Sequence, residues 1–264
     1  MDAAIQLVGP EDELIVVDGA STDGTAEVID SRRDFIDTFI SEPDISCDHA
    51  INKGMLVAQG KYIKHLTDDD EFFPEAMEQA ITLLESNPQV DVLVCGGMRQ
   101  LGVDTYPFYI PPGVNYGKSP EDVFNHGVCG CGFVIRRSSL AVTGLANPRG
   151  VATDAEFVAK AICNGALVRF CRVNLFHHPI YEHGAFIGRR QEWEHDMKRI
   201  VRQYCSLRFY LKYRIKTAIL RNRMLAPPAL VANHIARRLF ATLGGKRARA
   251  RKSLGEPVWD GGLS

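Results

Sequence analysis

Short apolar runs alternate with longer, helix-like segments over the first hundred residues. Leu14–Val17 and Val90–Cys95 are nearly continuous apolar runs, which is typical of strands buried on both faces of a parallel sheet. Thr38–Ser41 and Lys61–Leu66 carry β-branched and aromatic residues and also predict strands. Segments with apolar residues at helical spacing lie between these runs. The order β-α-β-α-β-α-β predicts an α/β fold with a mostly parallel sheet flanked by helices.

The helices of this region have recognisable start signals. The polar turn Asp18–Gly24 is expected to precede a helix, with Ser21 among its candidate caps. A second helix is expected over about 48–58, and a third begins near Pro74, because proline is favoured in the first turn of a helix.

The middle of the chain is less regular. It predicts a strand at 132–135 and a helix at 154–164. Tyr106–Pro112 is rich in proline and aromatic residues and is interpreted as a loop that covers the core or serves as an acceptor platform. Phe176–His183 contains three of the eight histidines and is also interpreted as a loop.

The net charge of −1 conceals a strong asymmetry. Residues 1–197 hold 15 Lys and Arg against 30 Asp and Glu, whereas residues 198–252 hold 16 Lys and Arg and no acidic residue. This split predicts a catalytic domain at 1–190, a basic amphipathic helical extension at 191–245 and a disordered tail at 246–264. The basic extension suits an anionic membrane surface, or it packs its apolar stripe on the acidic domain. Nucleic acid is not expected as a partner.

Composition places the chain among soluble proteins, with 45% apolar and 24% charged residues. No apolar run is long enough for a transmembrane helix, and the N-terminus lacks the features of a signal peptide. The seven cysteines are scattered, which suits reduced thiols in the cytoplasm. Cys129 and Cys131 have no second pair for a zinc knuckle, so we interpret them as buried thiols. We expect a cytoplasmic protein that can attach to the inner face of the plasma membrane.

Acidic turns follow three of the predicted strands. They contain Asp18, then Glu42 and Asp44, then the run Asp68–Asp70. The carboxyl ends of parallel strands meet at one edge of a sheet, where ligands bind. A divalent cation would relieve the repulsion among three adjacent aspartates, and hard oxygen ligands suit Mg²⁺ or Mn²⁺. Such a cation would hold a diphosphate, as a nucleotide-sugar site requires.

The segments ELIVVDGASTDGT, FISEPD and AINKGMLVAQGKYIKHLTDDD, with the proline that follows, resemble glycosyltransferase family 2. The resemblance covers about residues 11–100 and weakens toward Asp154. It implies a GT-A type (Rossmann-like) fold and an inverting transfer of a sugar from a nucleotide-diphosphate donor, a UDP-sugar first. The acceptor would be a glycan or a lipid-linked glycan in polysaccharide or cell-envelope biosynthesis.

The resemblance also implies roles for single positions. Asp18 matches the carboxylate that contacts the nucleotide base. Asp68–Asp70 covers the Asp-x-Asp metal motif, with Asp69 as the first choice of ligand and Asp70 facing the sugar or the metal. His183 lies where a late histidine completes the metal shell in related enzymes, although a loop histidine without that role is the competing interpretation. Further contacts to the nucleotide sugar are expected from Ser21, Asp44, Asn52, Lys53 and Asp68.

Asp154 falls where the family often carries its general base. An inverting transfer needs one base to deprotonate the acceptor hydroxyl, and a carboxylate suits that role. The alternative is that Asp154 caps the following helix, which the residues alone would favour. The match between Asp154 and the position of the family's general base favours the role of a base over that of a cap.

The family's first strand is not found, and Met1–Pro10 resembles the end of the helix that follows it. We therefore expect unpaired strand edges in this chain, and an upstream reading frame that encodes the strand. Two other functions stay open at this stage. One is a sugar-phosphate nucleotidyltransferase with the same fold, and the other is a truncated, non-catalytic relative that acts as a binding module.

Overall fold

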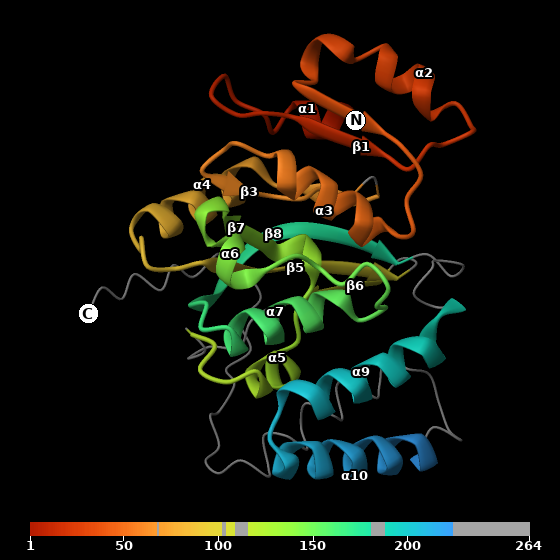
Figure 1. Ribbon diagram of the computed structural model, residues 1–264, viewed down its shortest axis with the longest axis vertical. Helices are drawn as coiled ribbons and strands as arrows, with labels where there is room; N and C mark the ends of the chain where they lie inside the picture. Colours follow the sequence, from red (N-terminus) through yellow and green to blue (C-terminus); the bar gives the residue numbers. More distant parts are fainter. Residues whose placement is uncertain (68, 102–103, 109–115, 181–187, 224–264) are drawn as a thin grey trace. The chain divides into compact units, whose positions relative to one another are not determined.

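The structure is a computed structural model that describes residues 1–67, 69–101, 104–108, 116–180 and 188–223. Residues Met1–Arg214 form one compact unit and Ile215–Ser264 form a second. The first unit contains the elements that position the candidate site (Figure 1). Asp68, His183 and residues 224–264, which include the predicted tail 246–264, lie outside the described residues.

Helices and strands follow one another along the first unit much as the hydrophobic pattern predicts. The helix α3 (Cys47–Val57) begins one residue earlier than expected, because the Ser46 hydroxyl caps it by accepting a hydrogen bond from the His49 N–H at 3.2 Å. The strands are β1 (Ile15–Asp18), β2 (Thr38–Ser41), β3 (Tyr62–Ile63), β4 (Glu71–Phe72), β5 (Val92–Leu101), β6 (Asp104–Phe108), β7 (Phe133–Arg136) and β8 (Val168–Ile180). The α-helices are α1 (Asp2–Ile5), α2 (Thr25–Asp30), α3 (Cys47–Val57), α4 (Pro74–Glu85), α5 (Glu121–His126), α6 (Leu140–Thr143), α7 (Thr153–Cys163), α9 (Arg190–Tyr204) and α10 (Leu207–Arg223).

The strands form two sheets. β1 and β2 pair in parallel, with Asp18 opposite Ser41 at the end of the ladder. The larger sheet has the order β3-β7-β5-β8-β4, and β6 pairs with β5. The expected mostly parallel arrangement is confirmed for β1–β2 and for β5–β8, but it is wrong for the other pairs, which are antiparallel. For β5 and β6 the reason is that the chain returns after a short connection, which permits only an antiparallel partner.

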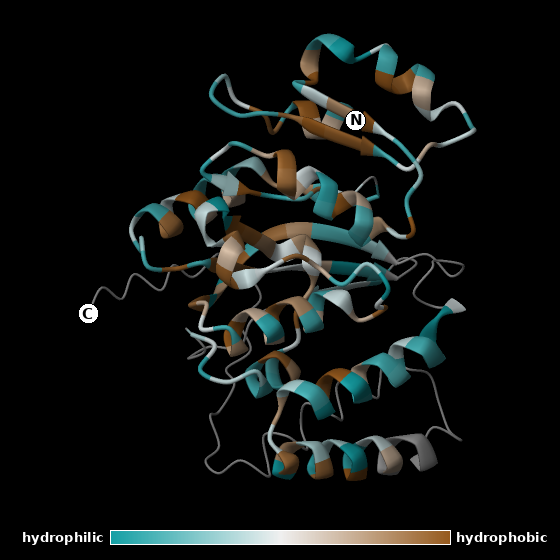
Figure 2. Cartoon of the chain, viewed as in Figure 1, coloured by the Kyte–Doolittle hydropathy of each residue, from teal (hydrophilic) through white to brown (hydrophobic). Residues whose placement is uncertain are grey.

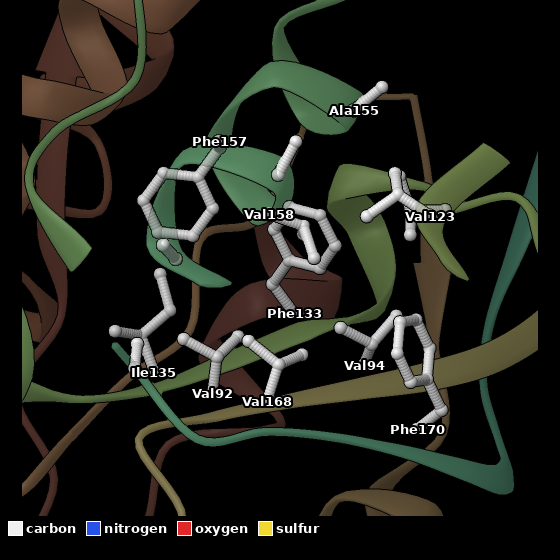
Figure 3. Close-up of a cluster of buried hydrophobic side chains, with 14 of the residues drawn as sticks. Val92, Val94, Val123, Phe133, Ile135, Ala155, Phe157, Val158, Val168 and Phe170 are labelled. Carbon is white, nitrogen blue, oxygen red and sulfur yellow. The ribbon is translucent and has the colours of Figure 1, made fainter. Parts of the chain in front are cut away.

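Two separate layers of apolar side chains cover the larger sheet. Successive residues of β5 point to opposite faces, so Val92 and Val94 pack with α5, α7 and α9, whereas Leu93 and Cys95 pack with α4. Figure 3 shows side chains of α7 above the valines of the strands, and Phe157 stacks on Phe133 with ring centroids 5.7 Å apart. These layers fix α7 on the sheet and thereby place its first turn.

A third, smaller cluster holds β1 and β2 to the neighbouring helices. Leu14, Ile29 and Ile36 are its buried members. Helix α3 contacts β1 through Gly54 and contributes Met55 to the core of the larger sheet. Among the described residues, β1 has no strand partner on its second edge, which agrees with the unpaired edge expected from the sequence.

The basic helices of the C-terminal part differ from one another. Ile200 and Val201 of α9 are fully buried, and Ile200 belongs to the same core as α7. This helix therefore packs on α7, in line with one of the two interpretations expected. Figure 2 colours most of α9 as hydrophilic, with a few hydrophobic residues. On α10, Leu207 and Leu211 are exposed. None of the described helices is long and apolar enough to span a bilayer.

Two segments interpreted as loops are strands in part. Tyr106, Pro107 and Phe108 belong to β6, and the rest of the Tyr106–Pro112 segment lies outside the described residues. The histidine-rich segment begins in β8, which continues to Ile180. The prediction failed there because pairing on both sides, with β4 and with β5, stabilises residues of low strand propensity.

Gly97 of β5 lies opposite Phe176 of β8. A Cβ atom at this position would lie 2.6 Å from the Phe176 backbone oxygen, so an alanine forces the two strands apart. We expect Gly97→Ala to lower the free energy of unfolding by about 1–3 kcal/mol, measured by denaturant unfolding. Gly24→Ala is the control, because nothing lies within 4 Å of its Cβ position and we expect a change below about 0.5 kcal/mol. Equal stability of the two variants would contradict the close approach.

Candidate active site

Asp18 ends β1 and is held by two serines. Its carboxylate accepts a hydrogen bond from the Ser21 N–H at 3.2 Å and one from the Ser41 hydroxyl at 2.8 Å. These side chains, Ser21 first and then Ser41, hold the pKa of Asp18 below its ordinary value. Ala20, which lies between Asp18 and Ser21 along the chain, has a φ of 62°, a left-handed conformation that costs a residue with a Cβ about 1–2 kcal/mol. Strain of this kind is concentrated at functional turns.

The acidic side chains of the second turn, after β2, form ion pairs with a lysine. Lys53 of α3 contacts Asp44 at 2.6 Å and Glu42 at 3.0 Å, and His49 contacts Asp44 at 3.1 Å. A Cβ atom on Gly19 would lie 3.4 Å from the Asp44 carboxylate, so the turns after β1 and β2 lie side by side. The structure therefore brings Asp18, Asp44 and Lys53 together, as the sequence predicts.

Asn52 has a different environment. Its amide donates to the Ala146 carbonyl and accepts from the Ala146 N–H, both at 2.9 Å. The residue is 7% exposed. Its side chain joins α3 to the segment after α6, so any effect of Asn52 on the bound donor would act through the position of α3.

Asp70 is the centre of a buried polar cluster. Its carboxylate contacts the His178 Nδ1 at 2.5 Å, accepts from the Cys131 thiol at 2.7 Å and accepts from the Thr67 hydroxyl. The Asp70 side chain is fully buried, which by itself would raise the pKa. The hydrogen bonds from His178, Cys131 and Thr67 outweigh burial and hold the pKa of Asp70 at about 2. The hydrogen bond to Asp70 in turn raises the pKa of His178.

The segment Cys129–Gly132 connects this cluster to the start of α7. Cys131 faces Asp70, while the Cβ position of Gly130 lies 3.3 Å from the His65 ring and 4.0 Å from the Asp154 Cβ. Two glycines in four residues allow this close approach of backbone to side chains. Asp70 and the first turn of α7 therefore lie on the two sides of one short segment.

Asp154 lies in the first turn of α7 and does not cap it. The N-cap residue is Ala152, and the Asp154 carboxylate accepts a hydrogen bond from the adjacent Ala155 N–H at 2.7 Å. The capping interpretation is therefore wrong. Burial raises the pKa of Asp154 to about 7, and the neighbouring Cys129 and Asp48 contribute in the same direction.

Three of the residues around these carboxylates were not expected from the sequence. Cys131 and His178 contact Asp70, and Asp48 of α3 accepts a hydrogen bond from the Thr153 side chain next to Asp154. The sequence around each of these three residues contains no motif and no periodic pattern that would predict a contact with Asp70 or with the start of α7. Asp69 is exposed at the same turn as Asp70.

Comparisons with known proteins give one consistent family. Residues 2–143 match the family model described as Glycosyl transferase family 2, a range that ends before Asp154. An uncharacterized glycosyltransferase of Rickettsia prowazekii (strain Madrid E) is 28% identical over 124 residues, which is 47% of this chain and 39% of the relative. One from Rickettsia typhi (strain ATCC VR-144 / Wilmington) is 29% identical over the same shares of both chains. The chain thus spans about two fifths of the length of these relatives.

Solved structures with the same fold include two glycosyltransferases. Staphylococcus aureus TarS 1–349, solved in complex with UDP-GlcNAc, has a TM-score of 0.59 at 16% identity, covering 76% of this chain and 60% of TarS. The mannosyltransferase PcManGT from Pyrobaculum calidifontis, in complex with GDP-Man and Mn²⁺, has a TM-score of 0.54 at 17% identity, covering 88% and 71%. These similarities confirm the expected α/β, GT-A type fold.

Proposed function

Because the chain belongs to glycosyl transferase family 2, we propose that it is an inverting, metal-dependent enzyme that transfers a sugar from a UDP-sugar. The acceptor is a glycan or a lipid-linked glycan in polysaccharide or cell-envelope assembly. The main support for this proposal is Asp154. Its pKa of about 7 suits a general base that works near neutral pH.

In this reaction Asp154 takes the proton of the acceptor hydroxyl. The acceptor oxygen forms a bond to the anomeric carbon while the bond from that carbon to the donor diphosphate breaks, which inverts the configuration. The proton then resides on the Asp154 carboxylate. Its place in the first turn of α7 stabilises the ionised form needed before the reaction, because negative charge is favoured at a helix N-terminus.

The turns after β1 and β2 are proposed to bind the nucleotide. Asp18 would accept a hydrogen bond from the N–H of the uracil ring, and Ser21 keeps its carboxylate ionised and oriented. Lys53 and Asp44 form an ion pair beside this carboxylate, and Lys53 offers its positive charge to the donor diphosphate.

The exposed carboxylate of Asp69 fits the divalent cation that such a donor requires. Carboxylate and diphosphate oxygens are the ligands preferred by Mn²⁺ and Mg²⁺, so Asp69 is proposed as a residue that would hold the cation. When bound, the cation would offset the charge that develops on the leaving diphosphate. Asp68 and His183, which lie outside the described residues, remain proposed as contributors to the sugar and metal contacts.

The family match favours glycosyl transfer over nucleotidyl transfer to a sugar phosphate. A donor-hydrolysis assay separates an enzyme from a non-catalytic relative, because slow release of UDP from the donor needs no acceptor. Attachment to the inner face of the plasma membrane also remains a proposal. It is supported by exposed Leu207 and Leu211, which lie on α10 among basic residues.

The affinity for UDP is expected to depend on Asp18. We expect Asp18→Asn to raise the Kd for UDP in the presence of Mn²⁺ by about tenfold or more, because a hydrogen bond to a charged group contributes about 1.5–3 kcal/mol. Isothermal titration calorimetry measures this change. Asp69→Ala is expected to remove the Mn²⁺ dependence of UDP binding in the same experiment.

Asp23→Asn is the matched control for Asp18→Asn. Asp23 lies in the same turn, is exposed and contacts Thr25, so we expect its Kd for UDP to stay within twofold of the unchanged chain. Equal affinities of the Asp18 and Asp23 variants would show that the nucleotide does not contact Asp18.

A further inference from the structure

A carboxylate, a thiol and an imidazole meet beside the acidic turn that follows β3. Asp70 follows β3, Cys131 precedes β7 and His178 lies in β8, so three separate segments of the chain contribute one residue each. Their carboxylate, thiol and imidazole atoms all lie within 4.8 Å of one another. Asp70 contacts both partners directly, at 2.5 Å to His178 and 2.7 Å to Cys131.

We propose that Asp70, Cys131 and His178 bind a transition-metal ion of intermediate softness, with Zn²⁺ as the occupant. This site goes beyond the proposed donor site, whose cation is assigned to the exposed Asp69. It gives the buried Asp70 a different role from the sugar or metal contact that the family resemblance implies. One oxygen, one sulfur and one nitrogen ligand are the set that Zn²⁺ uses, whereas Mg²⁺ selects oxygen ligands. Three protein ligands leave a fourth position of the tetrahedron for water or an anionic group.

The ligands need only a small rearrangement to bind zinc. Tetrahedral ligands about 2.0–2.3 Å from zinc lie about 3.3–3.7 Å from one another, so the Asp70 oxygens have to move away from their two partners by about 1 Å. The ion then takes the place of the protons that join Asp70 to His178 and Cys131. The His178 side chain is 30% exposed while Asp70 is fully buried, so an ion can enter past the imidazole.

Surrounding groups hold the ligands in place, as is usual around metal ligands. The Thr67 hydroxyl donates to Asp70, and the Lys64 ammonium donates to the Cys131 carbonyl at 2.8 Å. The Cys131 backbone is therefore anchored, and its thiol is directed at Asp70. Cys129 lies beside Cys131 and is a neighbouring thiol that the experiment has to separate from it.

Cobalt provides a direct readout of the thiolate ligand. We expect the chelator-treated chain to bind one equivalent of Co²⁺, with a thiolate-to-cobalt charge-transfer absorption in the near ultraviolet. One equivalent of Zn²⁺ should remove this absorption, whereas a hundredfold excess of Mg²⁺ should leave it. Cys131→Ser should abolish the absorption, and His178→Gln should raise the Kd for Co²⁺ at least about tenfold.

Two cysteine variants serve as controls. Cys163→Ser changes an exposed thiol, and Cys129→Ser changes the thiol beside the proposed ligand, so both should keep the absorption. Circular dichroism without metal confirms that each variant is folded. A charge-transfer band that persists in Cys131→Ser, or Co²⁺ binding without such a band in the unchanged chain, would overturn the proposal.

Failure of the two proposals can be told apart, because the cobalt absorption requires neither donor nor acceptor. A chain that shows the absorption but binds no nucleotide supports the metal site and contradicts the proposed function. A chain that binds UDP with Mn²⁺ but shows no thiolate absorption supports the donor site and contradicts the zinc-type site.

Discussion

Replacing Asp154 with asparagine is expected to lower kcat for sugar transfer by about 10²–10⁴-fold, the contribution typical of a general base. The asparagine retains the size of the side chain but accepts no proton from the acceptor hydroxyl. The KM for the donor should change little, because Asp154 contacts the acceptor in the proposed reaction. Initial rates with a nucleotide-sugar donor and an acceptor glycan measure both parameters.

The pH profile gives the same experiment a second readout. Burial raises the pKa of Asp154 from 3.8 to about 7, and the base acts only when ionised, so kcat should rise with pH and level off above about 7. Asp154→Asn should lose this rise. A variant that retains most of the activity with the same pH profile would show that another group is the base.

Stability provides the control for folding. The folded chain keeps the Asp154 proton between about pH 4 and 7, where the unfolded chain has already lost it, so the contribution of Asp154 to stability falls as pH rises through this range. Asp154→Asn removes a group that is costly to ionise in place and should not lower the melting temperature at pH 8. A large fall in Tm would instead assign the loss of activity to misfolding.

Replacing Arg199 with alanine is expected to lower the free energy of unfolding by about 2–4 kcal/mol. Arg199 of α9 donates to both Glu156 oxygens, at 2.8 and 2.6 Å, and to Asp196 at 2.7 Å. Glu156 lies in α7 and its side chain is 8% exposed, so the variant leaves a buried carboxylate without its cation. The loss falls below that of a fully buried pair because the Arg199 side chain is 37% exposed.

Thermal unfolding should show this change as a fall in Tm of about 5–10 °C. Arg189→Ala is the control, because its ion pair with Glu192 is exposed on both sides and should contribute less than about 1 kcal/mol. Asp196 also accepts hydrogen bonds from the Val151 and Ala152 N–H groups just before α7, so loss of Arg199 should disturb the segment that carries Asp154. If the two arginine variants melt alike, the network does not hold α9 to α7.

Much of the fold could be predicted from local sequence patterns. The apolar run that ends at Asp18 and the run Thr38–Ser41 are strands, and α4 begins at Pro74 as expected. The strand expected over Lys61–Leu66 shortens to Tyr62–Ile63, because β3 lies at the end of the larger sheet and, in the described part of the chain, pairs with β7 alone. Local patterns identify which residues favour a strand, but the length of the strand depends on its partner.

Part of the candidate site could also be predicted from the sequence, and part of it could not. The sequence by itself determined that carboxylates follow the strands and that the turns of Asp18 and Asp44 meet at one edge of the sheet. It also placed Asp154 at the start of a helix. It could not show that Cys131 and His178 contact Asp70, because these residues lie 61 and 108 positions away along the chain. Only the pairing of β8 with β4 and β5, and the course of the chain before β7, bring them together.

The physical reason is the range over which each property is encoded. Helix and strand formation depend on propensities and apolar spacing within a few residues, and these can be read directly from the sequence. The position of Cys131 depends on strand order and register, which are decided by packing across the whole core. The sequence therefore determined the elements and their acidic turns, whereas the tertiary structure decided which thiol and which imidazole meet the Asp70 carboxylate.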